Sequence, residues 1–157
     1  MLFQFQEYLT FENMYLWINL GVLPFWIMLF VIPNSKITRF FTNSIILPAI
    51  LTSTYVYVIY QAILLDEPIL DIFKLYLNID NLYTIFATES FLLIFWIHFV
   101  SINIFVGSWV AIDGAKHNMS RVLVFFPLIL IYLSGIIGIV LYWLIRVFYA
   151  KKLVFYD

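Results

Sequence analysis

Several polar side chains lie deep within long apolar stretches of this sequence, and they are the first candidates for chemistry. They are Asn19, Ser53, Tyr57, Gln61, His98 and Asn103. A polar group in hydrocarbon is costly, so it usually faces other protein groups or a functional site. If the stretches are helices, these groups lie at comparable depth and form one polar layer. This layer is the candidate binding or catalytic site.

His98 is the member of the layer with the broadest chemistry, because it is the only group there that titrates near neutral pH. The alternative is a structural role, since hydrogen bonds between membrane helices contribute about 0.6–2 kcal/mol each. The structural role is favoured for Asn19, Ser53 and Gln61, and both roles stay open for His98. We expect His98 to face the helix bundle, with Asn19 or Tyr57 as its partner, because an unpartnered imidazole in hydrocarbon costs several kcal/mol.

Metal and cofactor chemistry has little support in the sequence. The chain has 0 cysteines and 2 histidines, and His117 falls in a short polar segment between apolar stretches. Haem and zinc sites need more His or Cys ligands than one intramembrane histidine provides. The sequence contains no phosphate-binding glycine loop, nucleophile elbow or HExxH motif. We therefore expect neither a metal nor a cofactor.

The composition indicates that the polar layer lies within a lipid bilayer. Hydrophobic residues make up 65% of the 157 positions and charged residues 11%, and the mean hydropathy is +1.03. A soluble domain is about half apolar and about a quarter charged. The net charge of −1 provides no basic surface for nucleic acid. The expected partner is the lipid bilayer, and nucleic acid is not expected.

Four apolar stretches are long enough to span a bilayer, which takes about 20 helical residues. They cover residues 14–32, 44–65, 90–112 and 122–148. Continuous runs of this length argue against a membrane barrel, whose strands alternate. We predict an all-α integral membrane protein with four transmembrane helices in one bundle, forming a single domain over residues 1–157. Residues 66–88 are predicted to contain a short helix on the membrane surface.

Four crossings would place both termini on the same side of the bilayer. Lys36, Arg39, Lys116 and Arg121 would then lie on one side, and Lys74, Arg146, Lys151 and Lys152 on the other. Basic residues normally concentrate on the cytoplasmic side of a membrane protein. Because this topology divides them equally, the orientation stays open.

Aromatic, small and charged residues form a pattern in the second half of the chain. It consists of Trp96, His98, Phe105, Val106, Gly107, Trp109, Asp113, Pro127, Gly135, Gly138 and Arg146, and the first stretch adds Asn19, Pro24, Trp26 and Pro33. On these positions the chain resembles the abscisic-acid-deficient, neoxanthin-synthase-like family of small polytopic membrane proteins. The resemblance covers most of the chain outside residues 66–88. The chain departs from the family pattern at Ser108, Ile136 and Asn103, the last of which replaces an intramembrane aspartate.

The resemblance implies carotenoid chemistry. Plant members of this family are needed to convert violaxanthin into neoxanthin, an isomerisation in which an epoxide opens while a neighbouring carbon loses a proton. Such a step needs one group to protonate oxygen and another to accept the carbon-bound proton. On this basis the catalytic candidates are His98, Asn103 and Tyr57, and the candidates for contacts to the bound molecule are Asn19, Trp96, Trp109 and Asp113.

Asn103 argues against the family reaction, because an amide is not a base near neutral pH. Either Glu89, Asp113 or Tyr57 has been recruited, or catalysis has been lost. Two functions follow. The first is a membrane protein that binds or isomerises a carotenoid or isoprenoid lipid. The second is a non-catalytic accessory subunit, packed with other subunits into a respiratory or photosynthetic complex. The expected location is a bacterial inner membrane or the inner or thylakoid membrane of an organelle.

Overall fold

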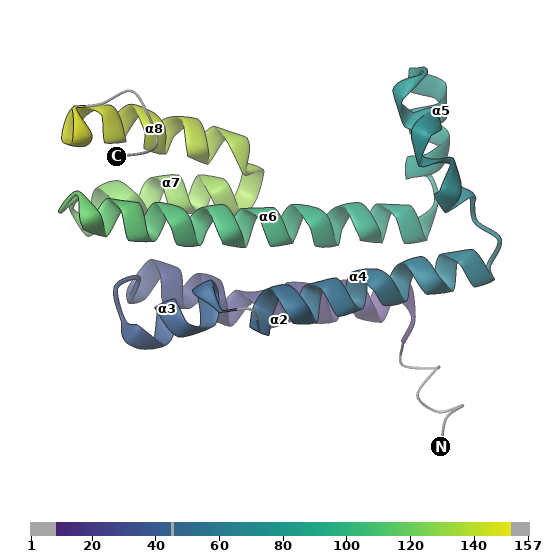
Figure 1. Cartoon of the computed structure of the whole chain (residues 1–157), viewed down its shortest axis with the longest axis horizontal. Helices are drawn as coiled ribbons and strands as arrows, with labels where there is room; N and C mark the ends of the chain where they lie inside the picture. Colours follow the sequence, from purple (N-terminus) through teal and green to yellow (C-terminus); the bar gives the residue numbers. More distant parts are fainter. Residues whose placement is uncertain (1–8, 45, 152–157) are drawn as a thin grey trace. The chain divides into compact units, whose positions relative to one another are not determined.

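The described part of the chain is built from helices, as predicted (Figure 1). The computed structural model describes residues 9–44 and 46–151 and, for residues 43 and 68–71, the backbone alone. In chain order the elements are α2 (Phe11–Val31), α3 (Lys36–Asn43), α4 (Ile46–Leu64), the 3₁₀ helix η1 (Pro68–Tyr76), α5 (Ile79–Phe86), α6 (Glu89–Lys116), α7 (Arg121–Ser134) and α8 (Ile136–Ala150).

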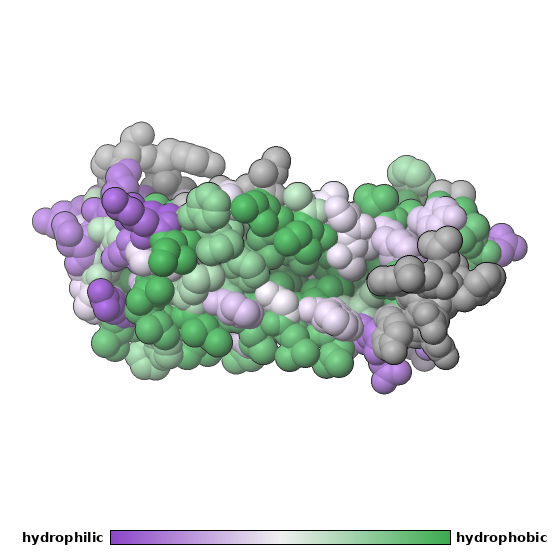
Figure 2. Space-filling view, turned by 90° about the horizontal axis from the view of Figure 1, so that it is seen from below, coloured by the Kyte–Doolittle hydropathy of each residue, from purple (hydrophilic) through white to green (hydrophobic). Residues whose placement is uncertain are grey.

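Three helical stretches are long and apolar enough to cross a membrane, namely Phe11–Val31, Lys36–Leu64 and Glu89–Lys116. They coincide with the first three predicted spans, although Ile45 in the second span lies outside the described residues. Hydrophobic side chains cover most of the face seen in Figure 2. Bulky apolar residues that are exposed along these helices are suited to contact with lipid, and they include Trp17, Ile50 and Phe105.

The helices group into two compact units. Unit 1 comprises Met1–Gly21 and Pro48–Phe99, and therefore holds the start of α2, most of α4, η1, α5 and the start of α6. Unit 2 comprises Val22–Leu47 and Val100–Asp157, and holds the rest of α2, α3, the rest of α6, α7 and α8. Each unit is described separately below. The predicted single transmembrane domain stays a prediction.

The connection between α4 and α6 is helical, as its apolar spacing predicts. Pro68 opens η1, where its missing N–H is not needed. The side chain of Asn78 caps α5 by accepting a hydrogen bond from the Asn81 N–H at 2.8 Å. The position of this connection on the membrane surface stays a prediction.

The fourth predicted span is not one helix, and the prediction of a single crossing over 122–148 is wrong. α7 ends at Ser134 and α8 begins at Ile136, because Gly135 between them has φ 65° and ψ −85°. Glycine tolerates a positive φ, which strains residues that carry a Cβ. With 14 and 15 residues, the two helices are about 21–22 Å long, shorter than a hydrocarbon core of about 30 Å. The hydrophobicity of the sequence does not reveal the break between α7 and α8.

α8 folds back along α7 (Figure 1). Gly138 makes this close approach possible: a Cβ there would lie 2.5 Å from the Pro127 carbonyl oxygen and would overlap the Ile131 backbone nitrogen. The two helices therefore pack backbone against backbone, as small residues allow in membranes. The result is a helical hairpin with its turn at Gly135.

Replacing Gly135 by alanine is expected to destabilise the protein by about 1–3 kcal/mol, the usual cost of a strained backbone conformation. The added Cβ would also lie 2.7 Å from Asn103 Oδ1. Gly21→Ala is the matched control, because no atom lies within 4 Å of a Cβ at that position and alanine favours a helix. Denaturant unfolding of both variants, followed by circular dichroism, provides the measurement. Equal stability of the two variants would contradict the strained turn at Gly135.

Candidate functional site

Two adjacent grooves border the N-terminal end of α6 in unit 1. The first, called the polar groove here, has a volume of about 430 Å³, and its lining includes Thr10, Phe11, Tyr57, Gln61, Glu67 and Glu89. The second, the aromatic groove, has a volume of about 510 Å³, and its lining includes Phe11, Glu12, Tyr15, Glu89, Leu92 and Trp96. Phe11 and Glu89 line both grooves. Because α2 begins, α4 ends and α6 begins here, the grooves lie at the ends of apolar spans.

Tyr57 is held in the polar groove by its own helix. Gln61, one turn further along α4, donates a hydrogen bond from Nε2 to the Tyr57 hydroxyl oxygen at 2.7 Å. This bond uses a lone pair of the phenol and leaves the phenolic proton available to a ligand. Tyr57 was predicted as a catalytic candidate, and the structure places it on the wall of a groove.

Two carboxylates share this region with Tyr57. Glu67 precedes η1 and accepts a hydrogen bond from the Ser90 hydroxyl on α6, which ties the α4–α6 connection to the start of α6. Glu89 is exposed and lies in the first turn of α6, where the helix dipole favours a negative charge. Its position between the two grooves makes it the carboxylate that a ligand in either groove would meet.

The wall of the aromatic groove is fixed by Asn19. Trp96 donates a hydrogen bond from Nε1 to Asn19 Oδ1 at 3.2 Å, and Asn19 Nδ2 donates to the Tyr15 carbonyl oxygen at 2.7 Å. The Tyr15 and Trp96 rings also contact each other, with centroids 5.7 Å apart. Asn19 therefore sets the orientation of Trp96, and both predicted residues belong to one structural feature.

The grooves combine an acid, a base and an apolar wall. Tyr57 can donate a proton, Glu89 can accept one, and Trp96, Tyr15 and Phe11 offer flat surfaces to an unsaturated ring. Among the described residues, those that line the two grooves include no lysine, arginine or histidine. No group of three or more acidic or histidine side chains in the described part of the chain is arranged to hold a metal ion.

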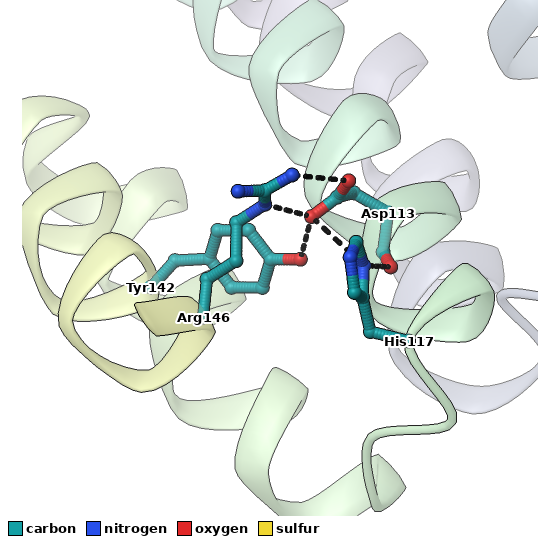
Figure 3. Close-up of polar contacts among 4 residues, drawn as sticks. All are labelled: Asp113, His117, Tyr142 and Arg146. Atoms are coloured by element: carbon teal, nitrogen blue, oxygen red, sulfur yellow. Dashed lines mark hydrogen bonds and ion pairs between the residues drawn. The ribbon is translucent and has the colours of Figure 1, made fainter. Parts of the chain in front are cut away.

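A second polar constellation lies in unit 2 and is centred on Asp113 (Figure 3). Arg146 on α8 donates from Nε to Asp113 Oδ2 at 2.7 Å and from Nη2 to Oδ1 at 3.5 Å. The Tyr142 hydroxyl, one turn earlier on α8, donates to Oδ2 at 2.6 Å. His117 lies beside the carboxylate, with Nδ1 2.9 Å from the Asp113 carbonyl oxygen.

This Asp113 cluster is closed to the outside. Asp113, Tyr142 and Arg146 are exposed by only 7%, 0% and 1%. A buried carboxylate is costly unless its oxygens are paired, and here the chain's own arginine and tyrosine pair them. Asp113 was predicted to contact a bound molecule. The structure surrounds it with protein donors, and Asp113 is not among the described residues that line either groove.

His98 does not face the helix bundle, so that prediction is wrong. Its side chain is exposed, and no hydrogen bond joins it to a described residue. His98 and Asn103 are five residues apart, which separates them by about 140° around a helix. Asn103, in contrast to His98, is buried, with 4% exposure.

The remaining predicted residues lie in unit 2. Asn103 packs beneath the turn at Gly135, where it is 2.7 Å from the position that a Cβ would take. Trp109 packs its ring edge-on against Tyr142, with centroids 5.6 Å apart, and so borders the Asp113 cluster. Within unit 1, Tyr57 and Trp96 line the grooves and Asn19 bonds to Trp96. Within unit 2, Asn103, Trp109 and Asp113 pack against other protein groups. That the polar residues of the spans form one site stays a prediction.

Sequence reasoning missed the importance of Glu67, Glu12 and Tyr15 for the grooves. A signal for Glu67 is present, because it ends one apolar stretch and Glu89 begins the next. Two consecutive membrane helices run antiparallel, so the end of one lies at the same membrane face as the start of the other. Carboxylates at both positions therefore indicate a shared acidic region. Sequence reasoning also missed Tyr142, whose hydroxyl pairs with a residue 29 positions away.

Comparisons with known proteins bear on the same residues. No curated protein and no solved structure matches the chain. A family model described as ABA DEFICIENT 4-like matches residues 13–142, which include α4, most residues that line the grooves and the turn at Gly135. Because this match covers well over half of the sequence, the chain belongs to the ABA DEFICIENT 4-like family.

Proposed function

We propose that this protein binds a neutral, oxygen-bearing carotenoid or related isoprenoid in the two grooves of unit 1. The observation that carries the proposal is the lining of the grooves, which joins aromatic walls to a tyrosine hydroxyl and carboxylates at the end of membrane-spanning helices. Membership of the ABA DEFICIENT 4-like family supports a carotenoid-related role. A xanthophyll places its oxygen-bearing end rings near the lipid headgroups, which is the level at which spans end.

The charge of the grooves narrows the ligand class. Glu12, Glu67 and Glu89 contribute carboxylates, and the described part of the chain places no basic side chain on the wall of either groove. A diphosphate group would meet like charges without a compensating cation, and such juxtaposition is strongly unfavourable. Prenyl diphosphates are therefore poor ligands, whereas hydroxyl and epoxide groups can bond with Tyr57 and with the carboxylates. The ligand is a neutral isoprenoid.

The same groups can carry an epoxide isomerisation. The Tyr57 hydroxyl gives its proton to the epoxide oxygen as the C–O bond breaks. Glu89 takes a proton from the neighbouring carbon, and the electron pair of that C–H bond forms the new double bond. Glu89 then returns its proton to the Tyr57 phenolate through water, so that atoms and electrons balance without a redox partner. Neither His98 nor Asn103 has a role in this scheme.

Pigment analysis of a violaxanthin-producing host tests the proposal. The unmodified chain, purified gently, is expected to carry xanthophyll, and Tyr57→Phe and Glu89→Gln are expected to lower neoxanthin at least about tenfold, as loss of a proton-transfer group does. Ser53→Ala is the matched control, because the Ser53 hydroxyl bonds only to the Ala49 carbonyl oxygen of its own helix. A chain that carries no pigment in any form would refute the binding site.

The role of Asn103 is decided in the same host. If Asn103 disables the family reaction, the unmodified chain makes no neoxanthin and Asn103→Asp restores it. If Tyr57 and Glu89 carry the reaction, the unmodified chain is active and Asn103→Asp adds nothing. Xanthophyll bound without conversion in both forms would assign a binding role without catalysis.

The second candidate function is a non-catalytic subunit of a larger membrane complex, and His98 is the observation that favours it. An exposed imidazole on a membrane span needs a polar partner that lipid chains cannot provide. Another subunit would provide one. In that case His98→Leu would release the protein from a large complex on native gels and leave bound pigment unchanged.

A further inference from the structure

The exposed basic residues of unit 2 gather where its helices end. α2 and α6 end side by side, because one small hollow is lined by Asn34, which follows α2, and by Ala115 and Arg121, on either side of the turn between α6 and α7. The ion pair of Arg146 with Asp113 brings the end of α8 to the same place (Figure 1). The basic end of unit 2, as this surface is called here, consists of Lys36, Arg39, Lys116, Arg121 and Lys151.

The charge of the basic end is not balanced by an exposed carboxylate. Among the described residues of unit 2, Asp113 is the only acidic one, and it is buried and paired with Arg146. No ion pair joins Lys36, Arg39 or Arg121 to a described residue. A cluster of exposed cations without counter-charges attracts anions to its surface. The basic end is therefore suited to an anionic partner.

The inner face of α3, the helix that carries Lys36 and Arg39, is fixed by hydrogen bonds. Ser35 caps α3 by accepting a hydrogen bond from the Thr38 N–H at 3.0 Å. The Thr38 hydroxyl is buried and donates to the Ile32 carbonyl oxygen at 2.8 Å. One turn later, the Thr42 hydroxyl accepts a hydrogen bond from the Ser108 hydroxyl of α6 at 3.0 Å. These contacts set which residues of α3 lie on the outside.

The outer face of α3 has a basic half and an apolar half. At about 100° per residue, Lys36 and Arg39 lie beside each other, and Phe40 and Ile37 follow them around the helix. Ile37 and Phe40 are exposed by 61% and 58%, and the two basic side chains are exposed as well. Such a division suits a partner that joins an anionic group to a hydrocarbon chain.

We propose that the basic end binds the headgroup of an anionic phospholipid, whose acyl chain lies along Ile37 and Phe40. The basic end adjoins helical stretches that are long and apolar enough to span a membrane, and headgroups lie at the ends of such spans. The guanidinium groups of Arg39 and Arg121 can each bond two oxygens of a phosphate. An acidic protein would match the charge but not the apolar half. The surface lies in unit 2, so the proposal does not rest on the ligand of the grooves in unit 1.

Native mass spectrometry of the purified protein tests the proposal. The protein is released from nanodiscs that contain equal amounts of phosphatidylglycerol and phosphatidylcholine, with acyl chains that distinguish the two lipids by mass. The unmodified chain is expected to retain phosphatidylglycerol in preference to phosphatidylcholine. Lys36→Gln combined with Arg39→Gln is expected to lower the ratio of the two retained lipids at least about fivefold, since one basic residue near an anionic surface contributes about 1 kcal/mol.

Three controls separate the charge of α3 from other effects. Lys36→Arg combined with Arg39→Lys keeps both charges and should keep the ratio. Lys74→Gln removes a basic residue of unit 1 and should also keep it. Phe40→Ala should lower the retention of both lipids and leave their ratio unchanged.

Three results would overturn the proposal. The first is equal retention of the two lipids by the unmodified chain, which is also the result expected if the basic end serves an acidic protein. The second is a ratio that the double glutamine variant leaves unchanged. The third is a charge-preserving double variant that loses the preference as fully as the glutamine variant does.

Discussion

A cysteine at Lys151 is expected to be labelled from the same side of the membrane as a cysteine at Asn118. We expect α2, α4 and α6 each to cross once, because they lie in the three stretches that are long and apolar enough to span a membrane. The α7–α8 hairpin would then enter and leave on the side where α6 ends. Arg146 fixes this return, because its ion pair with Asp113 holds the end of α8 beside the end of α6. With three crossings, the end of α8 and the start of α2 belong to opposite sides of the membrane. This expectation differs from the four-crossing topology, which places both termini on one side.

The charges support the same topology independently. Lys36, Arg39, Lys116, Arg121, Arg146 and Lys151 then lie on one side, and among the described basic residues only Lys74 lies on the other. Lys152 lies outside the described residues. The four-crossing topology places equal numbers of basic residues on the two sides of the membrane, whereas the three-crossing topology places nearly all of the described ones on one side. By the positive-inside rule the face that carries the end of α8 is the cytoplasmic one, or its equivalent in an organelle. The grooves with Glu67 and Glu89 then open on the opposite face.

Single-cysteine labelling with a membrane-impermeant maleimide provides the measurement. Because the sequence contains no cysteine, only the introduced residue can react. Tyr76→Cys, at a position exposed by 87%, reports the face opposite to Asn118→Cys. Intact cells should label Tyr76→Cys, and only opened cells should label Asn118→Cys and Lys151→Cys. Labelling of Lys151→Cys together with Tyr76→Cys would restore the fourth crossing.

The helical class and the first three spans were predictable because hydrophobicity and length determine them. The hairpin was not, because its cause is a backbone conformation at one residue. Gly135 stands in a run as apolar as any transmembrane helix, and a glycine inside a membrane helix is common. The depth at which a chain turns back depends on contacts such as Asp113 with Arg146, which are 33 positions apart.

The candidate site was predicted only in part, and the residues that were misjudged were misjudged for a physical reason. Tyr57, Asn19 and Trp96 were identified as polar or aromatic residues within spans; Tyr57 and Trp96 line the grooves, and Asn19 accepts a hydrogen bond from Trp96. His98 was given the same weight as Asn103, although the two side chains lie about 140° apart around the helix and have different neighbours. The sequence does not say which of them is buried. Asn103 lies on the same face of α6 as the small residues Gly107 and Ala111, which pack against neighbours, whereas His98 is exposed.

Breaking the Asp113 cluster is expected to have the largest effect on stability of any single change in unit 2. Arg146→Met should destabilise the protein by about 3–5 kcal/mol, because Asp113 would remain buried without its cation. Tyr142→Phe removes one hydrogen bond to a charged group and should cost about 1.5–3 kcal/mol. Unfolding of the purified variants in mixed detergent, followed by circular dichroism, measures both.

The double variant Asp113→Leu with Arg146→Met separates stability from function. Replacing a buried ion pair by apolar residues of similar size is often neutral or stabilising, so most of the loss in Arg146→Met should be recovered. If Asp113 acts only within this cluster, the double variant also keeps the pigment content and product level of the unmodified chain. Recovery of stability without recovery of pigment would instead assign Asp113 the ligand contact predicted from the sequence. If the double variant is as unstable as Arg146→Met, a further group must depend on the Asp113 carboxylate. His117 is the candidate for that group, because its Nδ1 lies 3.6 Å from Asp113 Oδ2.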